Sequence, residues 1–553
     1  MLKSLRMRSL VDLFFLSSVV VFLVLLARNP YSQRTLIPNL EPYPDSMHYV
    51  VPARSMVSGG LFKIIREERV INPSVPPLYS AFLAPFYLVN NDPRTYYFAN
   101  VALALLSIYL LFLILKLAIK DKWIIGISLF LFTTNFYMYW YPQWAMAENL
   151  ILPIFLFAVL LLIKPVSKTN IIFASIIPFL SYSTKYAYLP LAGTFVALYV
   201  LKVIWEKKTD RVRLGILFIL LSSILFLPIL IYQSYMQEIN PLIRYFNILV
   251  GTFSFGNANL VIGSDKFVGS GGWFSELFFQ KNFPIYVRGL LGEKARFLWD
   301  YTPLLPKYLI FPAWTGMFMG LFKKGVRYFS FSLMLLLALP LIFISTFSTQ
   351  DMRYIYHSVP TLILGISLFL FCVKDFLSKK KLYAVFVLGI FIIGGLYIFK
   401  NFQRLRYQTA LNLKYAETPW YYISVLRLND YFTKGKFLGD KMPYVISPMP
   451  PYYIDFYSNG NYRLLPLDKD QEFRQSKEAA WGYEDYSDFH GIYKKYLLEG
   501  YPVYVSTYGL GNEFYLHEAF DELSKDFKLT EVQNECYTQC KIYKLEFKNG
   551  KSI

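Results

Sequence analysis

Long apolar blocks recur through the first 400 residues of the chain, separated by short polar and basic segments. Most blocks are about 17 to 22 residues long, which is the length that a helix rising ~1.5 Å per residue needs to cross ~30 Å of hydrocarbon. Helices are the expected spanning elements. The pattern predicts about eleven transmembrane helices, at residues 11–27, 96–117, 123–140, 147–163, 171–183, 187–205, 214–232, 304–321, 329–347, 356–372 and 382–399.

Basic residues fall at alternate ends of these blocks and predict the topology. Lys3, Arg6 and Arg8 precede the first block, so the N-terminus is expected in the cytoplasm. Alternation then places two long loops, 29–94 and 233–303, on the extracytoplasmic side. An apolar stretch at 78–89 is too short to span and suits a helix lying in the interface. The expected location is the plasma membrane, with the C-terminus extracytoplasmic.

Composition agrees with this class. Of the 553 residues, 55% are hydrophobic and 17% are charged, and one soluble core could not hold so much apolar surface. The net charge of +19 comes from clusters between apolar blocks, not from one basic face. We therefore expect a polytopic α-helical membrane protein whose partner is the lipid bilayer. We do not expect it to bind nucleic acid.

The composition changes after about residue 400, where mixed polar and aromatic sequence replaces the apolar blocks. The expected organisation is a transmembrane domain at 1–399 and a small extracytoplasmic soluble α/β domain at 400–553. Strand-like segments lie at 444–447, 502–507, 528–533 and 541–547. Helix-like segments lie at 489–498 and 513–527. No internal repeat stands out.

Three cysteines give little further constraint. Cys536 and Cys540 lie in an oxidising compartment if the topology holds, so they form either a local disulfide or a pair of free thiols. A zinc site is less favoured because no histidine is close in the sequence. Cys372, near the end of a predicted span, is interpreted as a packed side chain.

Ionisable side chains at the predicted outer ends of the spans are the candidates for chemistry. Asp45 lies in the first external loop, Glu148 at the outer end of its span, and Lys185 with Tyr186 in a short outer turn. Another outer turn contains Asp351, Arg353, Tyr356 and His357. All converge on one face of the membrane, as a single active site requires. Charges at the outer ends are also what the water boundary of any membrane protein shows.

Several segments carry a resemblance to a known family: PDSMHYVVPARSMVSGG after the first span, PPLYSAFLAPFYLV following it, AMAENLILPIFLFAVLLL, FLSYSTKYAYLPLA and RYIYHSVPTLIL. Their order is similar to that of the GT-C glycosyltransferases, in particular the protein O-mannosyltransferase and aminoarabinose transferase branch, which use polyprenyl-phosphate sugars. The resemblance covers roughly the first 200 residues and the segment near residue 353, by pattern more than by strict motif.

The resemblance implies transfer of a sugar from a polyprenyl-phosphate donor to an acceptor hydroxyl on a protein, lipid or glycan, with inversion. Asp45 would be the general base. Arg353 and Lys185 would hold the lipid phosphate, with Arg54 as a further phosphate ligand. His48 would orient Asp45 or contact the sugar. The expected substrate-binding set is His48, Arg54, Glu148, Lys185, Tyr186, Arg353, Tyr356 and His357.

One departure from the family pattern bears on metals. A second acidic residue often follows the first-loop aspartate in that family, whereas this chain has Ser46 there. A second carboxylate would have to come from Glu41 or Glu148. We therefore predict neither a catalytic metal nor a cofactor, since the lipid-linked sugar is itself a substrate.

Plain structural roles compete with each assignment. Asp45 could cap a following helix, and Glu148 could be an interfacial carboxylate at the positive end of a span. Lys185 could snorkel to the interface, and Arg353 could be an interfacial anchor. Rival functions are a transporter or flippase, a polysaccharide polymerase or ligase, and a membrane scaffold. Span centres that are almost free of charge argue against a transporter.

Overall fold

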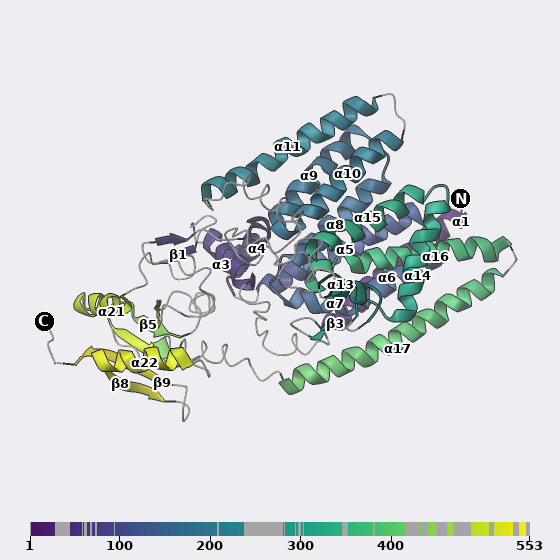
Figure 1. Ribbon diagram of the computed structural model, residues 1–553. Helices are drawn as coiled ribbons and strands as arrows, with labels where there is room; N and C mark the ends of the chain where they lie inside the picture. Colours follow the sequence, from purple (N-terminus) through teal and green to yellow (C-terminus); the bar gives the residue numbers. More distant parts are fainter. Residues whose placement is uncertain are drawn as a thin grey trace. The chain divides into compact units, whose positions relative to one another are not determined.

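The structure is a computed structural model (Figure 1) that describes residues 2–27, 45–57, 59, 64–66, 69–71, 75–92, 95–206, 210–236, 280, 282–293, 295–296, 300–301, 303–345, 352–379, 382–415, 428, 431–432, 441–448, 462–467, 488–507, 514–534 and 541–548. Contacts divide the chain into two compact units. The first unit comprises Met1–Leu36, Val75–Tyr79 and Tyr97–Ala410. The second comprises Ile37–Ser74, Ser80–Tyr96 and Leu411–Ile553.

Helices occupy every apolar block that the sequence predicted to span the membrane. They are α1 (Leu2–Ala27), α5 (Tyr96–Ala118), α6 (Lys122–Thr133), α7 (Phe136–Trp140), α8 (Glu148–Ile163), α9 (Lys168–Thr184), α10 (Leu189–Trp205), α11 (Arg211–Met236), α14 (Lys307–Phe322), α15 (Arg327–Ile344), α16 (Ser358–Lys379) and α17 (Tyr383–Tyr415). The short helices η3 (Tyr186–Tyr188) and η5 (Met352–Ile355) precede α10 and α16, and α13 (Phe283–Leu290) precedes α14.

Six helical segments of the described chain are long and apolar enough to cross a membrane: Leu10–Ala27, Tyr96–Ala118, Tyr186–Trp205, Val212–Ser234, Arg327–Ile344 and Met352–Ser378. Other apolar helices, such as α6 and α8, are shorter than 18 residues. The protein is therefore an integral membrane protein by length and composition. The number of eleven crossings stays a prediction.

The predicted span at 123–140 is not one continuous helix. It breaks at Asn135, whose side-chain oxygen accepts a hydrogen bond from the Tyr137 amide at 3.0 Å and so caps α7. The same side chain donates to the Leu304 carbonyl at 2.9 Å. An asparagine that caps the following helix and binds a distant carbonyl explains the break. A second departure is that α17 continues past residue 400, the predicted domain boundary, to Tyr415.

Helix α16 packs in the interior of the first unit through backbone contact with α14 (Figure 1). A Cβ atom added at Gly316 would collide with the Gly365 carbonyl oxygen, and one added at Gly365 would collide with the Ala313 carbonyl oxygen. Glycine at these positions therefore permits a close helix crossing. On α6, the Ser128 hydroxyl forms a 2.7 Å hydrogen bond with the hydroxyl of Ser367. These contacts fix α16, the helix that follows Arg353 and His357.

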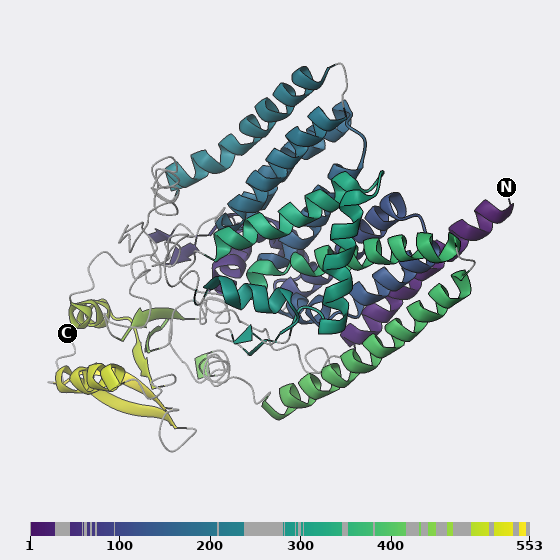
Figure 2. The same cartoon turned by 45° about the vertical axis from the view of Figure 1, so that its right-hand side comes forward.

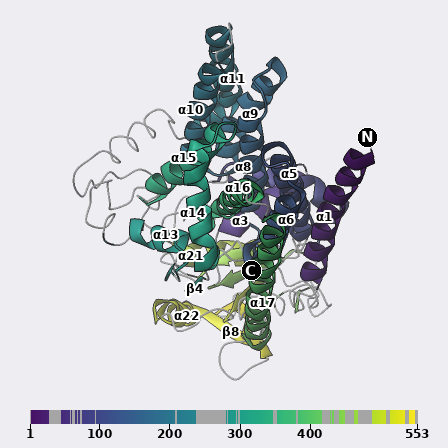
Figure 3. The same ribbon diagram turned by 90° about the vertical axis from the view of Figure 1, so that its right-hand side faces the viewer.

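Helices α1 and α17 lie at the edge of the first unit (Figures 2 and 3). Trp123 of α6 contacts both of them, with ring centroids 5.7 Å from Phe14 and 5.6 Å from Phe391. Their outward side chains are large, apolar and exposed, for example Leu16 and Phe399. Such surfaces suit contact with lipid.

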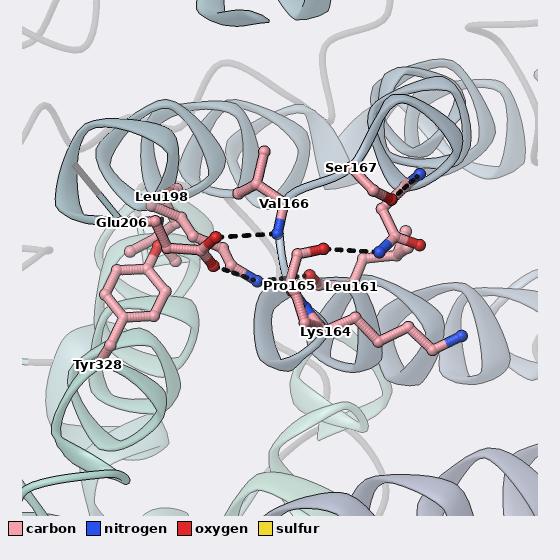
Figure 4. A network of polar contacts seen from close by, with 10 residues as sticks. Leu161, Lys164, Pro165, Val166, Ser167, Leu198, Glu206 and Tyr328 are labelled. Carbon is pink, nitrogen blue, oxygen red and sulfur yellow. Dashed lines mark hydrogen bonds and ion pairs between the residues drawn. The ribbon is translucent and has the colours of Figure 1, made fainter. Parts of the chain in front are cut away.

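A polar network, which we call the Lys202 network, joins the C-terminal ends of α8 and α10 (Figure 4). The Lys202 ammonium donates to the Leu161 and Lys164 carbonyls and lies 3.6 Å from a Glu206 carboxylate oxygen. The other Glu206 oxygen accepts a hydrogen bond from the Val166 amide at 3.0 Å. The network closes the turn between α8 and α9.

The second unit contains α3 (Asp45–Val57), the hairpin β1 (Ile64–Arg66) and β2 (Arg69–Ile71), and most of α4 (Leu78–Val89). Helix α4 has the predicted bounds 78–89. Within this unit, the Arg54 Nε donates to the Asn91 side-chain oxygen at 3.0 Å. Burial lowers the pKa of the Arg54 guanidinium, opposed by the nearby Tyr87 and Asp92. An arginine nonetheless remains protonated.

The C-terminal part of the second unit is a five-stranded mixed sheet in the order β6-β5-β7-β9-β8. Its strands are β5 (Tyr444–Ser447), β6 (Arg463–Pro466), β7 (Val503–Ser506), β8 (Phe527–Asn534) and β9 (Lys541–Phe547). Strands β6, β5 and β7 are parallel, whereas β9 and β8 are antiparallel to their neighbours.

Helices α21 (Phe489–Leu498) and α22 (Phe514–Asp526) accompany this sheet. A core that includes Tyr444, Tyr493, Val505 and Leu545 joins sheet and helices. A small C-terminal sheet with helices is present as predicted, with β5, β9 and α21 at the expected bounds, and the extent of a separate domain stays a prediction. Strand β6 was not predicted, because RLLP contains only two apolar residues in succession before proline. Cys536 and Cys540 lie outside the described residues.

Candidate functional site

Glu148 is the first residue of α8 and is fully buried in the first unit. Its Oε1 atom lies 2.7 Å from the Lys185 ammonium and 3.9 Å from the Arg353 Nε. We call these three residues the Glu148 cluster. Its members come from three separate parts of the chain, which meet at the N-terminal end of α8. Charged groups buried among apolar helices are costly unless they are paired and usually mark function.

The short 3-10 helix η2 (Tyr141–Gln143) and residues 144–147 lead into α8 and set the position of Glu148. Their carbonyl groups are held by two buried asparagine amides that sequence reasoning did not identify, Asn100 and Asn149. Asn149 donates to the carbonyls of Tyr141, Trp144 and Met146 at 3.0, 2.9 and 3.2 Å. Asn100 donates to the carbonyls of Pro142 and Trp144 at 3.1 and 2.8 Å. The sequence signal for Asn149 was its position directly after Glu148 at the start of a helix.

Lys185 lies where the chain leaves α9 and enters η3. Its backbone is extended, with φ −159° and ψ 129°, so the side chain departs from the helical path of α9. The side chain is buried, at 6% exposure, which excludes snorkelling into water in this structure. Beside Glu148, its ammonium lies 5.0 Å from the centroid of the Tyr354 ring.

Arg353 lies in η5, directly before α16, and is also buried. Its guanidinium carbon is 5.2 Å from the same Tyr354 ring, so that ring has a cation from each of two chain segments beside it. Its carbonyl oxygen accepts from the Tyr188 hydroxyl at 3.5 Å. The side chain of the preceding residue, Met352, packs against Gly289 of α13, where an added Cβ atom would collide with it.

His357 and Tyr356 follow Arg353 but occupy different surroundings. The His357 ring is 5.3 Å from Phe155 and 6.2 Å from Tyr188, and neither of its nitrogens hydrogen-bonds to any residue that the structure describes. The Tyr356 ring instead packs edge-on against Tyr141 at 4.6 Å. Its hydroxyl is 3.5 Å from the Tyr137 carbonyl. Tyr356 therefore supports the 137–141 segment.

Tyr186 is half-buried at the start of η3, and its ring lies 4.9 Å from Tyr182. The Tyr182 hydroxyl donates to the Gln233 side-chain oxygen of α11 at 3.0 Å. Tyr186 thus faces the α9 and α11 side of Lys185, and Tyr182 and Gln233 are additional polar residues there.

The remaining predicted residues belong to the second unit. Asp45 begins α3, which agrees with a position at a helix start, and its side chain lies outside the described residues. His48, one turn later, is buried. Arg54 is in the last turn of the same helix and contacts Asn91. The structure thus brings together Glu148, Lys185 and Arg353, with His357 one helical turn beyond Arg353.

The Glu148 cluster contains groups that can bind an anion. Two cations converge on one carboxylate, and Glu148 Oε2 has no hydrogen-bond partner among the described residues. A guanidinium and an ammonium side by side bind phosphate oxygens strongly, the first as a fork and the second as a point charge. Within the described residues, no group of three His, Cys, Asp or Glu could hold a metal. The prediction of no catalytic metal is left untested by this.

Comparison with solved structures identifies a similar fold. The chain resembles ArnT from Cupriavidus metallidurans, solved in the apo state, with a TM-score of 0.57 over 97% of each chain. The fold is ArnT-like. The two sequences are only 13% identical, so this similarity bears on the fold alone. No family model matches the sequence, and no curated protein matches it.

Proposed function

We propose that this protein is a membrane glycosyltransferase that moves a sugar from a polyprenyl-phosphate-linked donor to an acceptor hydroxyl. The ArnT-like fold supports this, since ArnT is an aminoarabinose transferase of the GT-C class. The Glu148 cluster carries the proposal, because a fold hosts many functions whereas a site has its own chemistry. Two buried cations among apolar helices suit a phosphate attached to a lipid.

Lys185 and Arg353 are proposed to bind the donor phosphate. Both lie beside the Tyr354 ring and near the same Glu148 oxygen, so one phosphate group could contact both. As the bond from the sugar to the phosphate breaks, negative charge develops on the leaving oxygen. Fixed cations stabilise that charge without reorganising, which lowers the barrier.

Asp45 is the proposed general base. The acceptor hydroxyl loses its proton to the Asp45 carboxylate and forms a bond to the anomeric carbon. At the same time the bond from that carbon to the phosphate oxygen breaks, and the lipid phosphate leaves with both bonding electrons. Attack from the face opposite the phosphate inverts the anomeric configuration.

Other candidates have supporting roles in this proposal. Tyr186, half-buried beside Lys185, offers an aromatic face to the sugar. His357, whose ring lies beside Tyr188, is proposed to contact the donor, and Tyr356 holds the segment before α8. His48 orients the base, and Arg54 is a further phosphate ligand. The acceptor belongs to a protein, a lipid or a glycan.

The proposed location of the reaction is the extracytoplasmic face of the plasma membrane, with the N-terminus in the cytoplasm and the C-terminal domain outside. The chemistry as proposed requires no metal. Transfer by the purified protein is therefore expected to be unchanged by EDTA, measured as sugar transferred per minute. Activity lost with EDTA and restored by Mg²⁺ or Mn²⁺ would contradict this part of the proposal.

The deciding experiment is mass spectrometry of envelope glycans from a strain in which the gene is deleted. The strain is studied alone and after complementation with the wild-type gene or with a gene that encodes Asp45→Asn or Lys185→Met. The strain alone should lack one sugar modification, which the wild type restores and both variants fail to restore. Lys202→Met, which removes a buried lysine far from the Glu148 cluster along α10, is the control and should restore it. Full restoration by Asp45→Asn would contradict the assignment of Asp45 as the general base and would favour a non-enzymatic role, such as transport.

A further inference from the structure

Glu148 is placed where an anionic ligand would also have to bind. Its Oε1 atom occupies the position 2.7 Å from the Lys185 ammonium and 3.9 Å from the Arg353 Nε. A phosphate oxygen that bound both cations would approach this carboxylate closely. Glu148 therefore offsets part of the positive charge of the two cations and repels an anion that binds them.

We propose that Glu148 is a specificity-determining counter-ion that discriminates between lipid phosphates by their charge. This inference rests on the proposed function. A sugar-linked lipid phosphate is a diester and carries one negative charge. The lipid phosphate released after transfer is a monoester, and monoesters carry a charge of about −1.5 to −2 at pH 7 because their second pKa is about 6. The fixed carboxylate repels the second species more strongly.

Coulomb repulsion is proportional to the charge of the ligand, so Glu148 weakens binding of a dianion about twice as much, in free energy, as that of a monoanion at the same distance. The cost is large here because burial lowers the effective dielectric constant. Glu148 thus favours the donor over the product and speeds release of the spent lipid phosphate. By the same argument it disfavours lipid diphosphates.

The surroundings of Glu148 differ from those of a carboxylate that only holds structure. In the Lys202 network, one Glu206 oxygen accepts a backbone amide hydrogen bond and the other faces Lys202. The Glu148 Oε2 atom, fully buried, has no such partner among the described residues. A buried acceptor without a partner has an energetic cost, which a functional site can retain. Glu206 therefore provides a matched control for the same chemical change.

The test measures binding of two probes, farnesyl phosphate and its methyl diester, to the full-length protein in detergent by calorimetry. Glu148→Gln removes the charge with little change in volume, and Glu206→Gln is the control. For Glu148→Gln, the ratio of monoester to diester affinity should rise about tenfold or more over the wild-type ratio. For Glu206→Gln it should stay at the wild-type value.

A second variant guards against a folding defect. Glu148→Ala removes the same charge as Glu148→Gln. The ratio of monoester to diester affinity should therefore rise in each of these variants that retains the wild-type unfolding temperature. An unchanged ratio in a folded variant overturns the inference. So does loss of the fold in both variants with Glu206→Gln intact, because Glu148 would then be structural. If the wild type binds neither probe, the proposed function itself fails.

Discussion

Two clusters of buried charge lie at opposite ends of α8 and differ in how their lysines are paired. In the Lys202 network, the lysine ammonium is held by main-chain carbonyls, and Glu206 binds a backbone amide as well. In the Glu148 cluster, an ammonium and a guanidinium approach one oxygen of a single carboxylate. The first arrangement gives hydrogen-bond partners to main-chain groups at the end of α8, whereas the second places two positive charges beside one carboxylate.

The difference separates a structural role of a buried ion pair from a role in ligand binding. Main-chain partners belong to the fold, so breaking the Lys202 network should reduce stability and leave ligand affinity unchanged. In the Glu148 cluster, the ion pairs instead join side chains from three segments of the described chain, and Glu148 lies at the start of α8. Changing them should act on binding and transfer. Variants of the two clusters can test this division.

The largest effect is expected from Lys185→Met and Arg353→Met. Each removes one cation that stabilises the leaving phosphate, and loss of one such group costs about 10²–10³ in rate. Sugar transfer with a purified donor checks this, and thermal unfolding shows whether the fold is kept. Rates within a few-fold of the wild type for both variants would mean that the Glu148 cluster is not the phosphate site.

Lys202→Met should have a smaller effect, and of the other kind. It removes the donor for the Leu161 and Lys164 carbonyls and leaves them without that partner, which costs about 1–3 kcal/mol of unfolding free energy. The KM for the donor should equal that of the wild type. A raised KM with unchanged unfolding temperature would show that the two clusters do not differ as described.

Asn149→Ala tests whether the segment before α8 positions Glu148. It deletes three hydrogen bonds to the carbonyls of that segment, so the carboxylate should lose its fixed place between the cations. We expect kcat to fall by about tenfold, since small misplacement near a reacting group is costly. Ser107→Ala, on α5, deletes one side-chain hydrogen bond to the helix backbone and serves as the control.

The smallest effect is expected at an exposed pair, His490 and Asp526 of the C-terminal sheet domain, whose Nδ1 and Oδ2 atoms are 2.6 Å apart. The hydrogen bond from His490 holds the pKa of Asp526 below its usual range. Its contribution is therefore present above the unfolded pKa of about 3.9 and is lost as pH falls through the lower folded value.

Because Asp526 is almost half exposed, solvent screening limits this contribution to no more than about 0.5 kcal/mol. Unfolding temperatures of the wild type and Asp526→Asn should therefore differ slightly at pH 6 and converge at pH 3. A difference that grows on acidification would mean that the pKa of Asp526 is raised by folding and not lowered.

Much of the fold could be predicted because apolar length and β-branched content are local signals. Helices occupy all of the predicted apolar blocks, and α4, α21, β5 and β9 have the expected bounds. The break at Asn135 could not be predicted, since it depends on the Leu304 carbonyl 169 residues away. Strand β6 was missed because it is short and gains its place by pairing with β5.

The candidate site was predictable as a set of residue types at one end of the spans, but not as an arrangement. Outer-end position indicated Glu148, Lys185 and Arg353, and the structure places them together. It could not indicate that Tyr356 packs against Tyr141. Nor could it reveal Asn100 and Asn149, because their role depends on the carbonyls of the segment before α8. The catalytic assignment of Asp45 stays a prediction.

The most direct test of the proposed phosphate site is an experimental structure of the full-length protein with a bound polyprenyl phosphate. We predict that the phosphate lies within hydrogen-bonding distance of both the Lys185 ammonium and the Arg353 guanidinium, beside the Tyr354 ring. A phosphate held elsewhere, with Lys185 and Glu148 still paired and out of contact with it, would contradict the assignment.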